Sequence, residues 1–170
     1  MNELLFLRPG HWNLIILPRQ RVDQLLVAMA HLALQTPLTV FDCGRQFDSS
    51  VVARAAHGRQ EIIDRIRVQR AFICYEVVKL LERAPMGRVP ILVLDFLSTF
   101  HDENVKMHTR RFLLEGSIQC FQTLSRSMGL AVTIQTSSTH DELYQRLSSS
   151  APRVSVYETQ ESGTQQLSLF

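Results

Sequence analysis

The sequence predicts an α/β fold with a mainly parallel central sheet. Short continuous apolar runs, such as those at 38–42 and 90–95, alternate with longer amphipathic stretches. Runs of this length, rich in β-branched residues, are typical of parallel strands buried on both faces. The amphipathic stretches between them indicate helices that cover the sheet.

Length and composition are those of one globular domain. The chain has 170 residues, 45% of them apolar, 20% charged, with a net charge of +2. Binding to nucleic acid would therefore need a local basic patch. Three cysteines without paired spacing, Cys43, Cys74 and Cys120, indicate buried or free thiols in a reducing compartment. The N-terminus does not resemble a signal peptide, and no apolar run reaches about 20 residues, so we expect a cytoplasmic protein without a membrane partner.

The elements follow in order along the chain. Strands are expected at 13–17, 38–42, 66–68, 90–95 and 131–134, with a half-exposed strand around Val154 and Val156. Helices are expected at 22–33, 50–56, 74–81, 109–128 and 141–147, where apolar residues recur at helical spacing. Gly58 and Gly129 are expected to end the second and fourth of these helices. The segment 100–108 is expected to be a polar loop.

Two of the predicted strands end in an aspartate, Asp42 and Asp95. The carboxyl ends of parallel strands form the edge at which open α/β folds bind ligands. In nucleotide-hydrolysing folds, an Asp in this position holds magnesium directly or through water. A buried strand that ends in a turn-forming Asp is the structural alternative.

Several strings together resemble the ATPase core of RecA/RadA-type recombinases. They lie at 40–47, where a strand ends in Asp, at 67–72 before a helix, at 90–95, which is similar to the Walker B strand, and at 111–133. The similarity spans roughly Gly10 to Tyr157. It implies a three-layer RecA-like core with a degenerate nucleotide site at 1–160, followed by a tail at 161–170.

The sequence departs from that family where nucleotide chemistry resides. The loop at 17–23 contains no glycine to wrap a phosphate, Pro18 lacks an N–H, and Val22 and Asp23 stand near the places of Lys and the hydroxyl residue. Gly44 stands where the family has a catalytic Glu, and it cannot act as a base. We therefore expect a pseudo-ATPase without cofactor or metal, in which Asp95 is a Walker B remnant that caps or hydrogen-bonds near a helix start. Arg19 and Arg21 remain candidates for holding a phosphate.

The last five residues resemble the bacterial sliding-clamp-binding pentapeptide: Gln166, Leu167, Ser168, Leu169 and Phe170. In this mode a peptide lies in a groove, where Leu169 and Phe170 fill an apolar pocket. The alternative is a last strand of the sheet. Residues 161–165 supply a short polar tether in the first interpretation.

Candidate DNA contacts are Lys106, Arg110 and Arg111, because the resemblance implies a DNA-facing loop there. Asp102 and Glu103 partly cancel their charge. His101, Asp102, Glu103 and His108 match no metal-site spacing, so we interpret them as a solvated loop. Arg65, Arg67 and Arg70 form a denser basic cluster beside Glu61 and Asp64.

The leading hypothesis is a non-catalytic RecA-like accessory protein of DNA repair or translesion synthesis, similar to ImuA-type subunits of bacterial mutasomes. Its partners would be the sliding clamp and recombinase or translesion polymerase subunits, with DNA bound weakly. The alternative is a recombinase paralogue that binds DNA or modulates filaments without ATP hydrolysis. A third hypothesis is an NTPase with an unorthodox loop.

Overall fold

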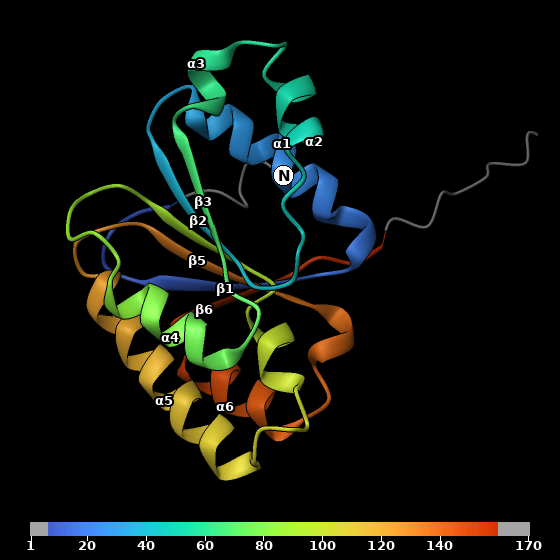
Figure 1. Ribbon diagram of the computed structural model, residues 1–170, viewed down its shortest axis with the longest axis vertical. Helices are drawn as coiled ribbons and strands as arrows, with labels where there is room; N and C mark the ends of the chain where they lie inside the picture. Colours follow the sequence, from blue (N-terminus) through green and yellow to red (C-terminus); the bar gives the residue numbers. More distant parts are fainter. Residues whose placement is uncertain (1–6, 160–170) are drawn as a thin grey trace, which may run out of the picture.

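A computed structural model describes residues 7–159, and within this range six strands form one sheet (Figure 1). The strands are β1 (Trp12–Leu17), β2 (Leu38–Asp42), β3 (Ile66–Arg70), β4 (Ile91–Leu94), β5 (Leu130–Gln135) and β6 (Arg153–Val156). Their order across the sheet is β3-β2-β4-β5-β1-β6, and every described neighbouring pair is parallel. The predicted α/β class with a mainly parallel sheet is confirmed.

Helices cover both faces of the sheet. They are α1 (Val22–Ala33), α2 (Ser49–Ala55), α3 (Gln60–Ile63), α4 (Cys74–Glu82), α5 (Met107–Leu124) and α6 (Glu142–Ser150). Short 3-10 turns follow three strands: η2 (Arg19–Arg21), η3 (Phe96–His101) and η4 (Thr136–Ser138). In Figure 1, α1, α2 and α3 lie above the sheet and α4, α5 and α6 lie below it. The molecule therefore has three layers.

The strands alternate their side chains between the two faces. In β1, Trp12, Leu14 and Ile16 face the core between the sheet and helices α4, α5 and α6. Ile15 and Leu17 face the core between the sheet and helices α1 and α2. This alternation follows from the two-residue period of a strand, and burial of both faces is why the strand sequences are apolar throughout.

A row of aromatic rings ties the centre of the sheet to the lower layer. The ring of Phe121 on α5 lies 5.1 Å from the ring of Trp12 and 5.1 Å from that of Phe96, and the ring of Phe100 lies 4.9 Å from that of Phe96. Tilted and edge-on rings at these distances add to the stabilisation that burial gives.

The expected polar loop at 100–108 is wrong at both of its ends. Phe100 is fully buried in η3, and α5 begins at Met107. Isolated apolar residues in a polar segment carry little periodicity, and their burial depends on the tertiary packing of Phe96 and Phe100. The four-residue α3 was not predicted either.

The expected C-cap at Gly129 is also wrong, because α5 ends at Leu124 and Ser125 is its C-cap. The absence of a side chain matters at Gly129 for another reason. A Cβ there would lie 2.6 Å from Leu7 Cβ and 2.7 Å from the Leu7 carbonyl oxygen, so the glycine lets the two backbones approach. Gly58, with φ of +70°, does follow the end of α2 as expected.

None of the helices in the described range is long and apolar enough to cross a bilayer. The predicted tail, residues 161–170, lies outside the described residues.

Candidate functional site

A cleft of about 810 Å³ lies at the carboxyl ends of the strands. The turn after β1 contributes Arg19, β4 is followed by Asp95, and β5 ends at Gln135. The loop after β2 and the end of β3 contribute the remaining wall, which includes Arg70. This is the edge at which parallel sheets bind ligands, so it is the first candidate site.

The turn between β1 and α1 is tight. Pro18 is extended, the Arg21 N–H donates to the Pro18 carbonyl at 2.9 Å, and α1 begins at Val22 without a side-chain cap. Asp23 lies in the first turn of α1 and lines the cleft. An aspartate suits the positive end of a helix but repels phosphate.

The two arginines of this turn differ in their surroundings. Arg19 lines the cleft. The guanidinium of Arg21 instead lies over the ring of Tyr157, 5.9 Å from its centre, at the end of β6. Of the two phosphate-binding candidates, only Arg19 is therefore placed to meet a ligand in this cleft.

Gly44 and Asp95 are packed against each other. A Cβ on Gly44 would lie 2.2 Å from Asp95 Oδ2 and 2.4 Å from Asp95 Cβ. The carboxyl group of Asp95 thus occupies the space that a side chain at position 44 would need. Position 44 cannot carry a glutamate while Asp95 keeps this conformation.

Asp95 is held by the neighbouring strand β5 and is only 3% exposed. Its amide donates to Thr133 Oγ1 at 3.0 Å, and its Oδ2 accepts a hydrogen bond from Gln135 Nε2 at 2.9 Å. Its backbone is left-handed, with φ of 50°, and its side chain makes no cap bond to η3. Of the two roles expected for Asp95, the cap is absent, and the hydrogen bond goes to Gln135, which ends β5 and directly precedes η4.

Burial raises the pKa of the Asp95 carboxyl above its ordinary value. The hydrogen bonds of Gln135 and the charge of His101 lower this pKa in part, whereas the charge of Asp42 raises it further. The other carboxyl oxygen, Oδ1, is buried without a hydrogen-bond partner among the described residues. The group therefore resists ionisation more than a solvated aspartate does.

Asp42 organises the loop after β2. Its two oxygens accept hydrogen bonds from the amides of Gln46 and Phe47, at 2.9 and 3.0 Å. Arg70, at the end of the adjacent β3, has its Nε 3.5 Å from Asp42 Oδ2 and donates to the Phe47 carbonyl. Much of the charge of Arg70 is therefore balanced within the wall of the cleft.

Arg45 lines the cleft and lies over the ring of Phe72, and neither residue was predicted from the sequence. The guanidinium of Arg45 lies 5.2 Å from the centre of the Phe72 ring, and Phe72 is 56% exposed. Arg45 is left-handed, with φ of 55°. Neither a cation–π pair across two loops nor a positive φ has a signature in a single sequence, since both depend on the tertiary arrangement.

The candidate DNA contacts lie at the start of α5, and two of the three have partners within the protein. Arg111 forms a two-pronged ion pair with Glu142 of α6, at 2.7 and 3.0 Å. Arg110 donates to the Phe100 carbonyl at 3.2 Å. Lys106 is exposed and precedes the helix.

Two of the residues interpreted as a solvated loop, His101 and Asp102, have hydrogen-bond partners. His101 Nε2 lies 3.1 Å from Asp141 Oδ2, and Asp102 accepts hydrogen bonds from Asn104. Among residues 7–159, no three His, Cys, Asp or Glu side chains are grouped to hold a metal ion.

The three cysteines are free thiols. Cys43 and Cys74 are buried, Cys120 is half-buried, and burial raises the pKa of each thiol. The expectation of buried thiols is confirmed for Cys43 and Cys74. The clamp-like pentapeptide at 166–170 lies outside the described residues.

The comparisons with known proteins identify the fold. No protein-family model matches the sequence, and no curated protein matches it either. Among solved structures, the crystal structure of the RadB recombinase is similar, with a TM-score of 0.63 over 90% of this chain and 77% of that chain, at 12% sequence identity. The chain therefore has a RecA-like recombinase fold.

Proposed function

We propose that this protein is a RecA-like accessory factor of DNA repair or translesion synthesis that does not hydrolyse nucleotide. The observation that carries the proposal is the contact between Gly44 and Asp95. In this fold the two positions would hold the general base and the metal-binding carboxylate. Here the second side chain fills the space of the first and leaves no room for a base.

Two further features of the cleft support loss of nucleotide chemistry. The η2 turn has no glycine and contains Pro18, so it does not present the row of amides that cradles phosphates. Asp23 adds a negative charge in the first turn of α1. A triphosphate with magnesium does not fit these residues, and we assign no chemical step to it.

We propose that the pentapeptide Gln166–Phe170 recruits the protein to the bacterial sliding clamp. The support is in the sequence, in which every position fits the clamp-binding pattern. The described chain leaves β6 at the same edge of the sheet as the cleft, where Tyr157 donates its amide to Ile16. The core would then serve as a docking platform for polymerase or recombinase subunits.

The test is calorimetric titration of purified clamp with the full chain and with a version that ends at Gln165. We expect micromolar binding by the full chain alone. A Leu169→Ala/Phe170→Ala variant should lose binding, whereas a Thr164→Ala/Gln165→Ala variant should retain it. Equal binding by the full and shortened chains would contradict recruitment through the pentapeptide.

The alternative proposal is a recombinase paralogue that binds DNA without hydrolysis, and the RecA-like fold favours it. If Lys106, Arg110 and Arg111 contact DNA, we expect the affinity for DNA to fall with rising salt. We also expect it to fall in an Arg110→Ala/Arg111→Ala variant. Because Arg111 is paired with Glu142, we expect Lys106 to contribute at least as much as Arg111. DNA binding that is unchanged by all three substitutions would exclude this surface.

A further inference from the structure

The charges of this protein are separated between the two edges of the sheet. The amino-terminal edge consists of the segments that lead into the strands: 7–13, 34–38, 64–67, 82–91, 125–130 and 151–153. These segments carry seven arginines and only two carboxylates. The arginines are Arg8, Arg65, Arg67, Arg83, Arg88, Arg126 and Arg153, and the carboxylates are Asp64 and Glu82.

The opposite edge has the reverse balance. The segments that follow the strands carry ten carboxylates against five Lys or Arg residues. These segments are 18–23, 42–48, 70–76, 95–106, 135–142 and 156–159. The cleft and Lys106 belong to this acidic edge, whereas Arg110 and Arg111 lie within α5, beyond these segments. A polyanion is therefore repelled from the carboxyl edge and attracted to the amino edge.

Backbone hydrogen bonds join the arginine-bearing segments into one continuous surface. Leu38 donates to the Arg65 carbonyl and Thr39 to the Pro90 carbonyl. Ile91 donates to the Gly129 carbonyl, and Gly10 donates to the Ser125 carbonyl. The arginines are thus spread along one edge of a single sheet, and they are fixed relative to each other by the strands.

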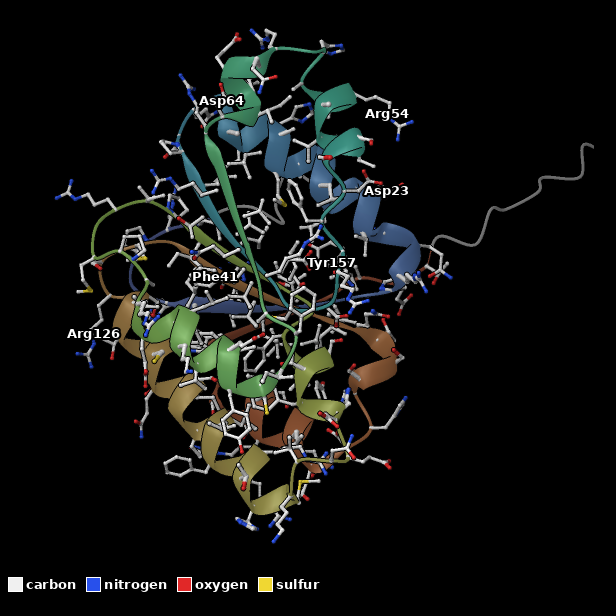
Figure 2. All side chains as sticks on the ribbon, viewed as in Figure 1. Asp23, Phe41, Arg54, Asp64, Arg126 and Tyr157 are labelled. Atoms are coloured by element: carbon white, nitrogen blue, oxygen red, sulfur yellow. The ribbon has the colours of Figure 1, made fainter. Side chains whose placement is uncertain are left out.

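Most of the arginine side chains on this edge make no hydrogen bond or ion pair with another described residue. All seven are exposed, and Arg67, Arg83, Arg88, Arg126 and Arg153 have no side-chain hydrogen bond or ion pair with another described residue. Arg65 differs, because it donates to the carbonyls of Ala33 and Leu34 at the end of α1. In Figure 2, Arg126 points outward from the side at which α5 ends.

Two hollows lie along the same edge. One, of about 660 Å³, is lined by Arg8, His11, Asn13, Arg153 and two prolines. The other, of about 420 Å³, is lined by Arg65, Arg67, Asp64 and apolar residues. Each hollow is lined by two arginines, and in each pair one, Arg153 or Arg67, makes no side-chain hydrogen bond or ion pair with another described residue. Arginine is the side chain best suited to bind phosphate oxygens.

We propose that the amino-terminal edge of the sheet binds the phosphate backbone of duplex nucleic acid. Six strands about 4.8 Å apart make an edge of about 24 Å, which matches several successive phosphates. The basic residues of this edge, histidine aside, are all arginines, without lysine, and arginine suits phosphate recognition. The segments offer no exposed Phe, Tyr or Trp, since Trp12 is buried, and His11 is their one exposed aromatic ring, so a single strand has little on which to stack its bases.

An anionic membrane would also attract arginines, but this edge offers it little apolar surface. Of its large apolar side chains, only Leu34, Met86 and Val89 are exposed, and they lie in two separate loops. Membrane binding through a surface usually combines basic residues with a continuous apolar face. The arrangement therefore favours a nucleic-acid backbone. The inference does not depend on clamp binding, and either can fail alone.

The experiment measures fluorescence anisotropy of a labelled 24-base-pair DNA duplex, at several salt concentrations, with the full chain. The test variant is Arg67→Ala/Arg88→Ala/Arg126→Ala. The charge-matched control is Arg54→Ala/Arg59→Ala/Lys79→Ala, which removes three exposed cations from α2, the start of α3 and α4. Thermal unfolding of each variant confirms that the fold is retained.

We expect the test variant to lose at least tenfold in affinity at about 0.1 M salt, and the slope of log K against log salt to fall by about 2 to 3. The control should change affinity less than twofold. The proposal would be overturned if both variants lost affinity for the duplex equally. It would also be overturned if the protein bound a single strand more tightly than the duplex, or did not bind the duplex. Equal, edge-dependent binding to vesicles containing phosphatidylserine would overturn it as well.

Discussion

At the scale of single residues, Gly44 and Asp95 determine what the cleft can do. Asp95 adopts a left-handed backbone, which is uncommon for residues other than glycine and costs free energy. Its carboxyl group then lies over Gly44, where a side chain would collide with it. The two residues are therefore coupled, and substitutions at the two positions should not be additive.

Substitution of Gly44 by alanine should destabilise the protein by about 1 to 3 kcal/mol, because it overpacks the contact with Asp95. Urea unfolding of Gly44→Ala, Asp95→Gly and the double variant measures the coupling. In the double variant the added methyl group should be tolerated, so the Gly44→Ala cost should largely vanish.

Gly116→Ala is the matched control. A Cβ there meets nothing within 4 Å, and alanine favours the helix, so stability should rise.

Asp95 should also make stability depend on pH. Its pKa is raised in the folded state, so the folded protein binds this proton more tightly than the unfolded chain does. The stabilisation is present below the unfolded pKa and is lost as the pH rises through the folded pKa. Asp95→Asn should therefore be more stable than the natural protein at neutral pH, and this advantage should shrink as the pH falls toward 4.

Urea unfolding at several pH values measures this difference, and Glu103→Gln, an exposed carboxylate, is the control. An advantage of Asp95→Asn that does not vary with pH would contradict the assignment of a raised pKa to Asp95.

At the scale of elements, polar contacts join η3, α5 and α6 on one side of the sheet. Asp141 caps α6 by accepting a hydrogen bond from the Tyr144 amide at 2.9 Å, and it also contacts His101 in η3. Glu115 and Arg146 form a second ion pair between α5 and α6, beside that of Arg111 and Glu142. These contacts link the helices that follow β4 and β5.

Asp141→Ala should lower the free energy of unfolding by about 1 kcal/mol, because α6 loses its N-cap. Asp141→Asn should cost much less, since asparagine also caps helices. Denaturant unfolding of both variants distinguishes the cap from the contact with His101. Equal losses in both would indicate that the His101 contact, not the cap, is what stabilises this junction.

The regular elements could be predicted because their sequences are periodic. The helix Val22–Ala33 and the strands at 38–42 and 91–94 are where the apolar pattern places them. The exact end of α5 and the η3 turn could not be predicted, because they depend on how Phe96, Phe100 and Phe121 pack. The same limit applies to the site. Asp95 was found from its place at the end of a strand and Gly44 from the resemblance to recombinases, whereas their mutual contact exists only in the folded molecule.

At the scale of the whole molecule, the sheet has a basic amino edge and an acidic carboxyl edge. The net charge of +2 conceals this separation, because it sums two edges of opposite sign. The acidic edge carries the cleft, which we propose does not turn over nucleotide. If the nucleotide site is silent, nucleotide should not change the stability of the whole protein.

Magnesium and ATP at millimolar concentrations should leave the thermal unfolding midpoint unchanged. A ligand at 100 times its Kd would stabilise the fold by about 2.7 kcal/mol, which raises the midpoint by several degrees in a domain of this size. Differential scanning fluorimetry measures the midpoint with and without nucleotide. A rise that Asp95→Ala abolishes would revive the hypothesis of an NTPase with an unorthodox loop.

The position of β1 in the sheet affects how the chain folds during synthesis. β1 is the first of the described strands along the chain, yet its neighbours in the sheet are β5 and β6, the last two described strands. While residues 18–129 are being made, the apolar β1 has neither partner, and an unpaired apolar strand is prone to aggregate. The nascent chain is therefore expected to need a chaperone until Arg153–Val156 has emerged and closes the second side of β1.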